Sequence, residues 1–271
     1  MFYLRVISAL IGIPIVIGAV YLGGIWYTLL LMIAVNLGIF EYYKMFKSQG
    51  FYLPISFGFV GVTLMIWIFY LEQQQFLYAA LMILLVLLSL HALFYMGRFS
   101  ISESALLLWG IIYLGVLAGY MVSLRMLPEG TFYTYILLFS VWIHDTLAYF
   151  IGIKWGVRKF APLISPNKSV EGSLAGVLGL TTILFSMTIL WPDYLPINPL
   201  QAAILGLGIA IFAQLGDLLE SALKRQLKVK DSGGLIPGHG GILDRMDSLL
   251  LSAPFVYYFF IFINLLKGVQ L

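Results

Sequence analysis

The chain has 271 residues, of which 62% are hydrophobic and only 10% are charged, and its mean hydropathy is +1.01. A soluble domain of this length needs charge on about a quarter of its residues, so the composition excludes an ordinary soluble protein and indicates an integral membrane protein. The net charge of +3 fits basic loops on one side of a membrane and gives no reason to expect a nucleic-acid partner. The absence of cysteine excludes disulfides, thiolate nucleophiles and cysteine-ligated zinc.

Long apolar segments follow one another along the chain. Because a membrane-spanning helix needs about 20 mostly apolar residues, we expect an all-α, polytopic integral membrane protein with about nine transmembrane helices. The expected spans are residues 5–22, 25–43, 53–71, 76–96, 104–124, 132–153, 172–191, 199–222 and 246–266. The first segment is interpreted as a span and not as a cleaved signal peptide. The apolar runs are too long, and alternate too little, for barrel strands.

The distribution of basic residues predicts the orientation. With the N-terminus inside, the loops after even-numbered spans are also inside, and these regions hold 13 of the 15 Lys and Arg residues. Only Arg125 and Lys267 are left outside, as the positive-inside rule expects. The two longest polar connections, 154–171 and 223–245, are then cytoplasmic, and the C-terminus is outside. We expect a multi-pass protein of the cell (inner, cytoplasmic) membrane whose site faces the cytoplasm.

The charged residues divide a single expected membrane domain, 1–271, into two parts. Residues 1–130 contain few charges and are interpreted mainly as scaffold helices. Glu41 and Lys44 have the i,i+3 spacing of an interfacial ion pair, and His91 and Glu103 are expected to face lipid headgroups. Residues 131–271 are the expected catalytic half, with the loops 154–171 and 223–245.

Polar residues form a stripe on the span at 199–222. At 100° per residue, one face of this helix carries Gln214, Asp217, Ser221 and Lys224. Charge at membrane depth costs a few kcal/mol per residue, so it usually marks a functional site.

Four carboxylates are expected near the cytoplasmic ends of their helices: Asp145, Asp217, Asp244 and Asp247. Carboxylates gathered in a poor solvent repel one another unless a cation binds. Hard oxygen ligands without cysteine suit Mg²⁺, which commonly takes one or two carboxylates together with substrate phosphates. The sequence therefore predicts a pocket that holds Mg²⁺ and a phosphorylated substrate.

The loop 223–245 is both basic and rich in glycine. Glycines allow close backbone approach to phosphate oxygens, and nearby Lys and Arg supply positive charge. The loop before span 172–191 adds the segment Ser165-Pro-Asn-Lys-Ser-Val-Glu-Gly172. Simpler interpretations stay open: an ordinary flexible loop, Asp244 as the N-cap of the last span, and Ser169 as the cap of the helix that follows it. A Ser-His-Asp hydrolase using His144 or His239 is disfavoured, because no G-x-S-x-G motif occurs.

Residues Ser221 to Asp247 resemble the signature of the phosphatidate cytidylyltransferases (CDP-diacylglycerol synthases). The segment contains S-x-L-K-R, then K-D-S-G, then I-P-G-H-G-G-I-L-D-R-M-D, with full spacing over 27 residues. The segments Asp145–Tyr149 and Ser165–Gly172 also look like family segments. Over the first five spans the likeness is confined to hydrophobic character.

The resemblance implies that CTP and phosphatidic acid react to give CDP-diacylglycerol and pyrophosphate, with Mg²⁺ required. A second cation, divalent or monovalent such as K⁺, is compatible with the same residues. The expected metal ligands are Asp217, Asp244 and Asp247, and Lys168 and Asp145 complete the expected catalytic set. The expected substrate-binding residues are Ser221, Lys224, Arg225, Lys230, Asp231, His239, Gly240, Gly241 and Arg245.

Two rival functions make different demands on the sequence. A transporter should distribute charge through the depth of the membrane and not at one rim. A CDP-alcohol phosphotransferase should carry a D-G-x-x-A-R pattern, which is missing here. The expected partners are CTP, phosphatidic acid and the lipid bilayer, and a homodimer is compatible with the sequence.

Overall fold

The computed structural model describes residues 2–95, 97, 99–192, 195, 197–235 and 240–268. Within these residues, seven helices are long and apolar enough to cross a membrane. Two shorter apolar helices, Val6–Leu22 and Ile55–Tyr70, coincide with the expected spans 5–22 and 53–71. The predicted class, an all-α polytopic membrane protein, is therefore confirmed.

The chain forms two compact units. The first contains residues 1–127 and 226–246, and the second contains residues 128–225 and 247–271. The boundary falls inside the last helix, whose first turn belongs to the first unit. The connection 226–246 is therefore part of the first unit although it follows helices of the second. The roles predicted for residues 1–130 and 131–271 stay predictions.

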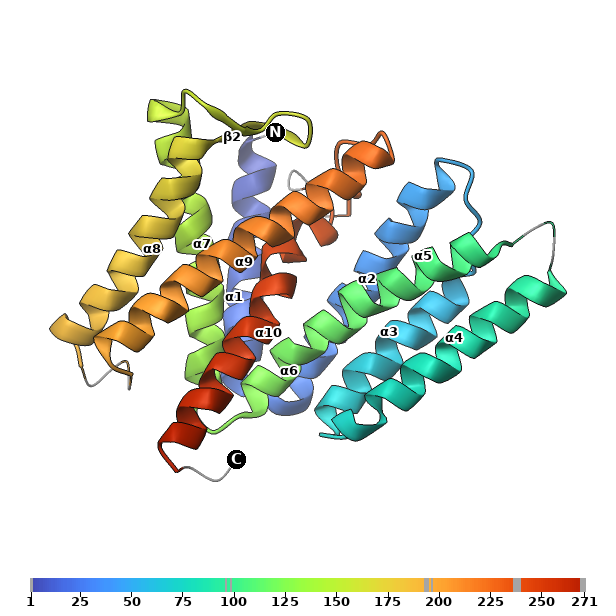
Figure 1. Ribbon diagram of the computed structural model, residues 1–271, viewed down its shortest axis with the longest axis horizontal. Coiled ribbons are helices and arrows are strands. Elements are labelled where there is room, and N and C mark those ends of the chain that lie inside the picture. Colours follow the sequence, from blue (N-terminus) through green and yellow to red (C-terminus); the bar gives the residue numbers. More distant parts are fainter. Residues whose placement is uncertain are drawn as a thin grey trace. The chain divides into compact units, whose positions relative to one another are not determined.

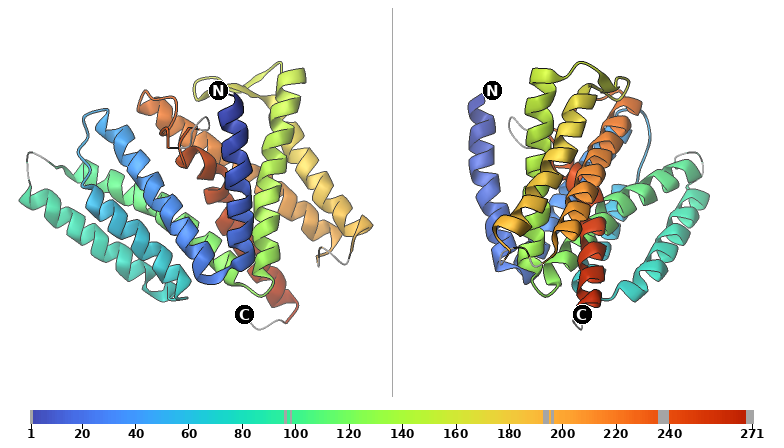
Figure 2. Two further views of the ribbon diagram at one scale, coloured as in Figure 1. Left: turned by 180° about the vertical axis from the view of Figure 1, so that it is seen from behind. Right: turned by 60° about the vertical axis from the view of Figure 1, so that its left-hand side comes forward.

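Helices make up most of the first unit. They are α1 (Phe2–Leu22), α2 (Gly24–Lys47), α3 (Ile55–Tyr70), the short η1 (Gln74–Phe76), α4 (Leu77–Phe94), α5 (Ile101–Ile111), the π-helical η2 (Ile112–Val116) and α6 (Leu117–Met126). The last three form one continuous apolar rod, Ile101–Met126. Helices α2, α3 and α4 follow one another side by side, and α3 also packs against this rod (Figure 2).

Two charged side chains of the first unit hydrogen-bond to the backbone at helix ends. Arg125 donates from Nε to the carbonyl oxygen of Val20, 2.7 Å away, where α1 ends. A cation near the last carbonyl groups of a helix is stabilising. Glu103 accepts from the Ser100 backbone N–H at 2.7 Å and completes a capping box at the start of α5. Because Glu103 is buried there, the prediction that it faces lipid headgroups is wrong.

The second unit contains α7 (Gly130–Trp155), α8 (Val170–Leu190), α9 (Pro199–Gln226) and most of α10 (Leu243–Leu266). Helices α7 and α8 lie side by side (Figure 1). Gly172 permits this contact, because a Cβ atom there would lie 2.6 Å from the Ala148 carbonyl oxygen.

A small antiparallel hairpin joins α7 to α8. It consists of β1 (Lys159–Ala161) and β2 (Ser165–Ser169), with Lys159 opposite Ser169. Glu171 links the two ends of the hairpin, since its carboxylate accepts from the backbone N–H groups of Val157 and Arg158, both at 3.1 Å. The sequence predicts only a polar loop here.

Candidate active site

Lys168 and Asp217 form an ion pair at the end of the hairpin. The Lys168 Nζ atom lies 2.6 Å from Asp217 Oδ2, and the Ser221 hydroxyl donates to Asp217 Oδ1 at 3.2 Å. The Lys168 and Asp217 side chains keep 25% and 35% of their surface exposed. A ligand can therefore reach both charges without unfolding the hairpin. We call Lys168, Asp217, Ser221 and Asp247 the Asp217 cluster.

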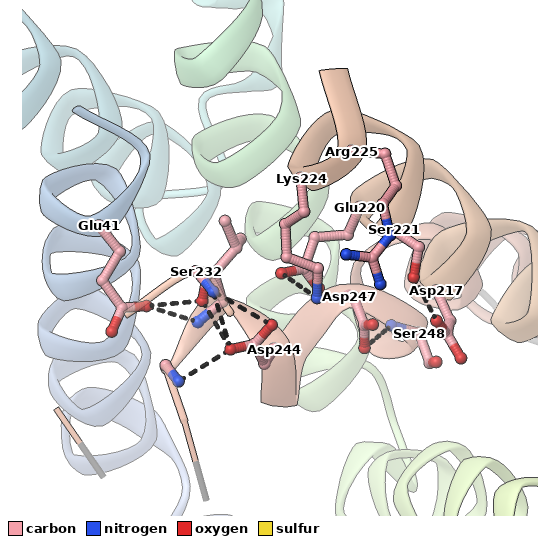
Figure 3. A network of polar contacts seen from close by, with 12 residues as sticks. Glu41, Asp217, Glu220, Ser221, Lys224, Arg225, Ser232, Asp244, Asp247 and Ser248 are labelled. Atoms are coloured by element: carbon pink, nitrogen blue, oxygen red, sulfur yellow. Dashed lines mark hydrogen bonds and ion pairs between the residues drawn. The ribbon is translucent and has the colours of Figure 1, made fainter. Parts of the chain in front are cut away.

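Asp247 joins this cluster because α9 and α10 approach closely. A Cβ atom at Gly216 would collide with the backbone of Asp247, so only glycine permits this spacing. The approach places Asp217, the next residue of α9, beside Asp247, and the negative charge of Asp217 acts on the Asp247 carboxylate (Figure 3). Asp247 Oδ1 also accepts from the Ser248 backbone N–H at 2.7 Å. Two carboxylates therefore lie close together, and one of them, Asp217, is paired with Lys168.

The hairpin is fastened to α9 and α8, which fixes where Lys168 lies. Arg225 donates from Nε to the Ile164 carbonyl oxygen at 3.1 Å. At the other end of β2, the Ser169 side chain caps α8 by accepting from the Gly172 backbone N–H at 3.1 Å. The simpler interpretation of Ser169 as a helix cap is thus confirmed. Lys168 stands between these two attachments and points to α9.

Asp244 lies in the first unit and organises the connection before α10. Its Oδ2 atom accepts from the Ser232 hydroxyl at 2.9 Å, the Ser232 backbone N–H at 3.1 Å and the Gly241 backbone N–H at 2.9 Å. Asp244 stands inside the first turn of α10, after Leu243, so it does not occupy the N-cap position. Its carboxylate instead joins two distant points of the glycine-rich connection.

Glu41 of α2 contacts the same connection. Its Oε2 atom accepts from the Leu243 backbone N–H at 3.0 Å and from the Ser232 hydroxyl at 3.3 Å (Figure 3). The predicted ion pair between Glu41 and Lys44 is wrong: Glu41 is only 1% exposed, and the Lys44 ammonium lies over the Phe40 ring, 4.3 Å from its centroid. We call Glu41, Ser232, Gly241 and Asp244 the Asp244 cluster.

Comparison with known sequences assigns this chain to a family. Residues 3–263 match the model of the Cytidylyltransferase family. This chain belongs to the cytidylyltransferase family. The protein is 34% identical over 263 residues to the phosphatidate cytidylyltransferase of Bacillus subtilis, covering 94% of this chain and 96% of that protein. It is also 34% identical over 284 residues to that of Synechocystis sp., covering 94% and 95%.

A third cytidylyltransferase relative shows a higher identity over a shorter stretch. The phosphatidate cytidylyltransferase of Staphylococcus epidermidis is 39% identical over 158 residues, which cover 58% of this chain and 59% of that protein. The residues that resemble the family signature, Ser221 to Asp247, contribute to both clusters: Ser221 and Asp247 to one, Ser232, Gly241 and Asp244 to the other. The signature therefore includes residues that bear charge and residues that hold the backbone in place.

The remaining predicted residues of this cytidylyltransferase occupy varied surroundings. Lys224 lies 3.3 Å from the buried carboxylate of Glu220, one turn earlier on α9. Asp145 is exposed on α7, with its Oδ1 atom 3.1 Å from His144 Nδ1. The structure leaves four more residues exposed or half-buried: Lys230, Asp231, Gly240 and Arg245. His239 lies outside the described residues.

The hydrolase alternative finds no support at His144. This histidine is buried, and a Cβ atom at Gly176 of α8 would lie 2.9 Å from its ring. Among the described residues, no hydrogen-bond partner reaches His144 Nε2. In that part of the chain, no serine is therefore placed for activation by His144.

A divalent cation fits the donors of the Asp217 cluster. Asp217 and Asp247 offer hard oxygen atoms, and their mutual repulsion would be relieved by a cation. Within the described ranges, no three Asp, Glu or His side chains could hold a metal ion by themselves. Mg²⁺ usually takes one or two carboxylates together with substrate phosphates, so the predicted Mg²⁺ site stays a prediction. Asp244, the third predicted ligand, is occupied by its loop hydrogen bonds.

Two residues of these clusters were not singled out by the sequence analysis. Glu41 was interpreted as part of an interfacial ion pair, and Ser232 appeared only as part of the glycine-rich loop and its K-D-S-G segment, without a role of its own. The signal that could have found Glu41 is a carboxylate in an otherwise apolar helix, which is costly unless it has a specific partner. The spacing of residues gives no signal for the contact between Glu41 and Ser232, because the two are far apart in the sequence.

Proposed function

We propose that this protein transfers a cytidylyl group from CTP to phosphatidic acid and releases CDP-diacylglycerol and pyrophosphate. The observation that carries the proposal is the Asp217 cluster, in which paired acidic groups and a lysine meet at the end of a membrane helix. Family membership supports nucleotidyl transfer, and two relatives that align across 94% of the chain are phosphatidate cytidylyltransferases.

The reaction exchanges one phosphoanhydride bond for another. A phosphate oxygen of phosphatidic acid attacks the α-phosphorus of CTP, the new P–O–P bond forms, and the bond between the α-phosphorus and the bridging oxygen breaks. The electron pair leaves with pyrophosphate. Phosphatidic acid is already an anionic nucleophile, so the step needs little acid–base catalysis. Its main demand is stabilisation of charge on the phosphate oxygens.

Asp217 and Asp247 would hold Mg²⁺ in this proposal, with the phosphate oxygens of CTP completing its coordination. When bound there, Mg²⁺ supplies positive charge to the phosphate groups and to the leaving pyrophosphate. The two carboxylates come from neighbouring helices whose close approach depends on Gly216. Their separation is therefore set by helix packing and not by a loop, which favours a fixed geometry.

Lys168 would exchange partners when substrates bind. Its ammonium neutralises Asp217 at 2.6 Å. With Asp217 and Asp247 holding a cation, Lys168 would no longer be needed to neutralise Asp217 and would bind a phosphate oxygen. Such a charge-assisted contact contributes about 1.5–3 kcal/mol. Arg225, one turn beyond Ser221, supports the exchange by keeping the hairpin attached at Ile164.

The apolar surface of α9 suits a lipid substrate. Leu215 and Leu219 are exposed on the helix that carries Asp217, and side chains of this kind face acyl chains in a bilayer. A lipid phosphate at the membrane surface is thus brought beside the Asp217 cluster by its own anchoring. The charge distribution predicts that this surface faces the cytoplasm, where CTP is available, and the bacterial relatives support a cell-membrane location.

The product distinguishes this function from its rivals. Detergent-purified protein given CTP, phosphatidic acid and Mg²⁺ should form a lipid whose mass is that of CDP-diacylglycerol. Omission of phosphatidic acid should abolish product formation. Consumption of CDP-diacylglycerol with an added alcohol would indicate the phosphotransferase instead. Solute flux into vesicles without any lipid turnover would indicate a transporter.

A further inference from the structure

A buried carboxylate of α2 is bonded to the glycine-rich connection at two points. Glu41 Oε2 accepts from Ser232 near the middle of the family signature segment and from Leu243 at the beginning of α10. The single hydroxyl hydrogen of Ser232 is shared between Glu41 Oε2 and Asp244 Oδ2, and the Ser232 backbone N–H also donates to Asp244, so Ser232 links the two carboxylates within the first unit. Figure 3 shows Glu41 pointing from α2 toward Ser232.

Two glycines of the connection are packed against the same carboxylate. A Cβ atom at Gly233 would collide with Oε1 and the carboxyl carbon of Glu41, and one at Gly241 would collide with the Ser232 hydroxyl and lie 2.5 Å from Glu41 Oε2. Gly234, the next residue after Gly233, has open space around it. Gly233 and Gly241 therefore pack closely against Glu41 because they have no side chain.

We propose that Glu41 is a positioning residue for cytidylyl transfer, which fixes Ser232, Gly233 and Gly241 of the connection and the start of α10 without touching the substrate. The inference rests on the proposed function, because the connection carries the predicted substrate-binding residues Lys230 and Gly240. It extends that function to α2, a helix that the sequence analysis interpreted as scaffold.

The hydrogen bonds indicate that Glu41 acts as an acceptor and not through its charge. Both donors, the Leu243 N–H and the Ser232 hydroxyl, reach the same oxygen, Oε2. Among the described residues, Oε1 is buried without a hydrogen-bond partner. A glutamine carbonyl oxygen can replace Oε2 and accept both bonds, whereas alanine removes both.

The first test compares two substitutions of Glu41 with a matched control. Glu41→Ala should lower kcat about tenfold to a hundredfold, since small displacements of catalytic groups are costly. Glu41→Gln should stay within about threefold of wild type, because it keeps the acceptor. The control is Glu103→Ala, which removes another buried capping carboxylate of the same unit. It should lower Tm and leave the kcat of the folded enzyme unchanged.

Two results of these assays would overturn the proposal. If Glu41→Gln loses as much activity as Glu41→Ala, the charge itself is required, as for a metal ligand. If Glu41→Ala lowers Tm by as much as Glu103→Ala does but keeps its kcat, Glu41 is only a stabilising residue.

A second readout does not depend on activity. Because the chain has no cysteine, the half-buried Ile242 can be replaced by cysteine and labelled with a maleimide in detergent. Labelling should be several-fold faster with Glu41→Ala than with wild-type Glu41, Glu41→Gln or Glu103→Ala. Equal rates in all four backgrounds would overturn the positioning role. If the wild type shows no cytidylyl transfer, that result counts against the proposed function, and the labelling rates still decide whether Glu41 positions the connection.

Discussion

The Lys168 ammonium lies 2.6 Å from the Asp217 carboxylate, and this ion pair joins the hairpin before α8 to the polar face of α9. Gln214, one turn earlier on that face, hydrogen-bonds to Ser173 near the start of α8. The polar stripe of α9 is thus directed at α8 and the hairpin, while Leu215 and Leu219 remain exposed. In a membrane protein, the polar face of an amphipathic helix usually packs against other protein segments and not against lipid.

The ion pair predicts a specific requirement for Lys168. Lys168→Ala should lower kcat/KM for CTP by about ten- to a hundredfold, because about 1.4 kcal/mol corresponds to a factor of ten. The double variant Asn167→Lys/Lys168→Asn keeps the loop charge but moves it by one residue along β2, to the other side of the strand. It should not restore activity in steady-state assays. Wild-type kcat/KM in the double variant would mean that only the charge of the loop matters.

Asp217 and Asp247 are expected to share the cation. Asn at either position should lower kcat by roughly a hundredfold or more, as when one group that stabilises the transition state is removed. It should also raise the Mg²⁺ concentration needed for half-maximal rate. Stability should change little, since one of two repelling charges is lost. The control is Glu129→Gln, an exposed carboxylate of the same unit. Near-normal turnover of Asp247→Asn at saturating Mg²⁺ would contradict the assignment.

Neighbouring glycines should differ in their tolerance of alanine. Gly233→Ala places a methyl group against Glu41, which costs about 1–3 kcal/mol by overpacking, whereas Gly234→Ala meets open space. We expect Gly233→Ala to lower kcat by about tenfold or more and Gly234→Ala to stay within about twofold. Both are measured by steady-state kinetics at one enzyme concentration. Equal loss in the two variants would show that the connection needs flexibility and not this packing.

The predicted orientation can be checked with single cysteines in a chain that has none. Leu163 in the hairpin and Leu235 in the connection before α10 are 91% and 42% exposed, so either cysteine is accessible to a reagent on its own side. An impermeant maleimide should label neither position in intact cells and both in inverted membrane vesicles. Labelling of either position from outside intact cells would overturn the predicted topology.

Periodicity and hydropathy were sufficient to predict the helices, because spans in a membrane must satisfy their own backbone hydrogen bonds. The expected span 104–124, for example, lies within the continuous rod Ile101–Met126. The stripe of α9 could also be predicted, since Gln214, Asp217 and Ser221 repeat at helical spacing. Helical geometry alone determines which of its residues share a face.

Contacts between distant segments could not be predicted in the same way. Nothing in the spacing indicates that Glu41 of α2 accepts from Leu243, or that Gly216 allows α10 to approach Asp217. The hairpin was missed because its two strands are only 3 and 5 residues long and are closed by Glu171, which a sequence pattern does not distinguish from a surface charge. Such contacts depend on how helices pack, and local patterns do not determine that packing.

The central claim is that this membrane protein joins a cytidine nucleotide to a lipid phosphate. The most direct measurement is pyrophosphate release by detergent-purified protein with phosphatidic acid, Mg²⁺ and each of CTP, ATP, GTP and UTP in turn. We predict release with CTP that depends on both phosphatidic acid and Mg²⁺, and little release with the other three nucleotides. No CTP-dependent release, or equal release with phosphatidic acid left out, would contradict it.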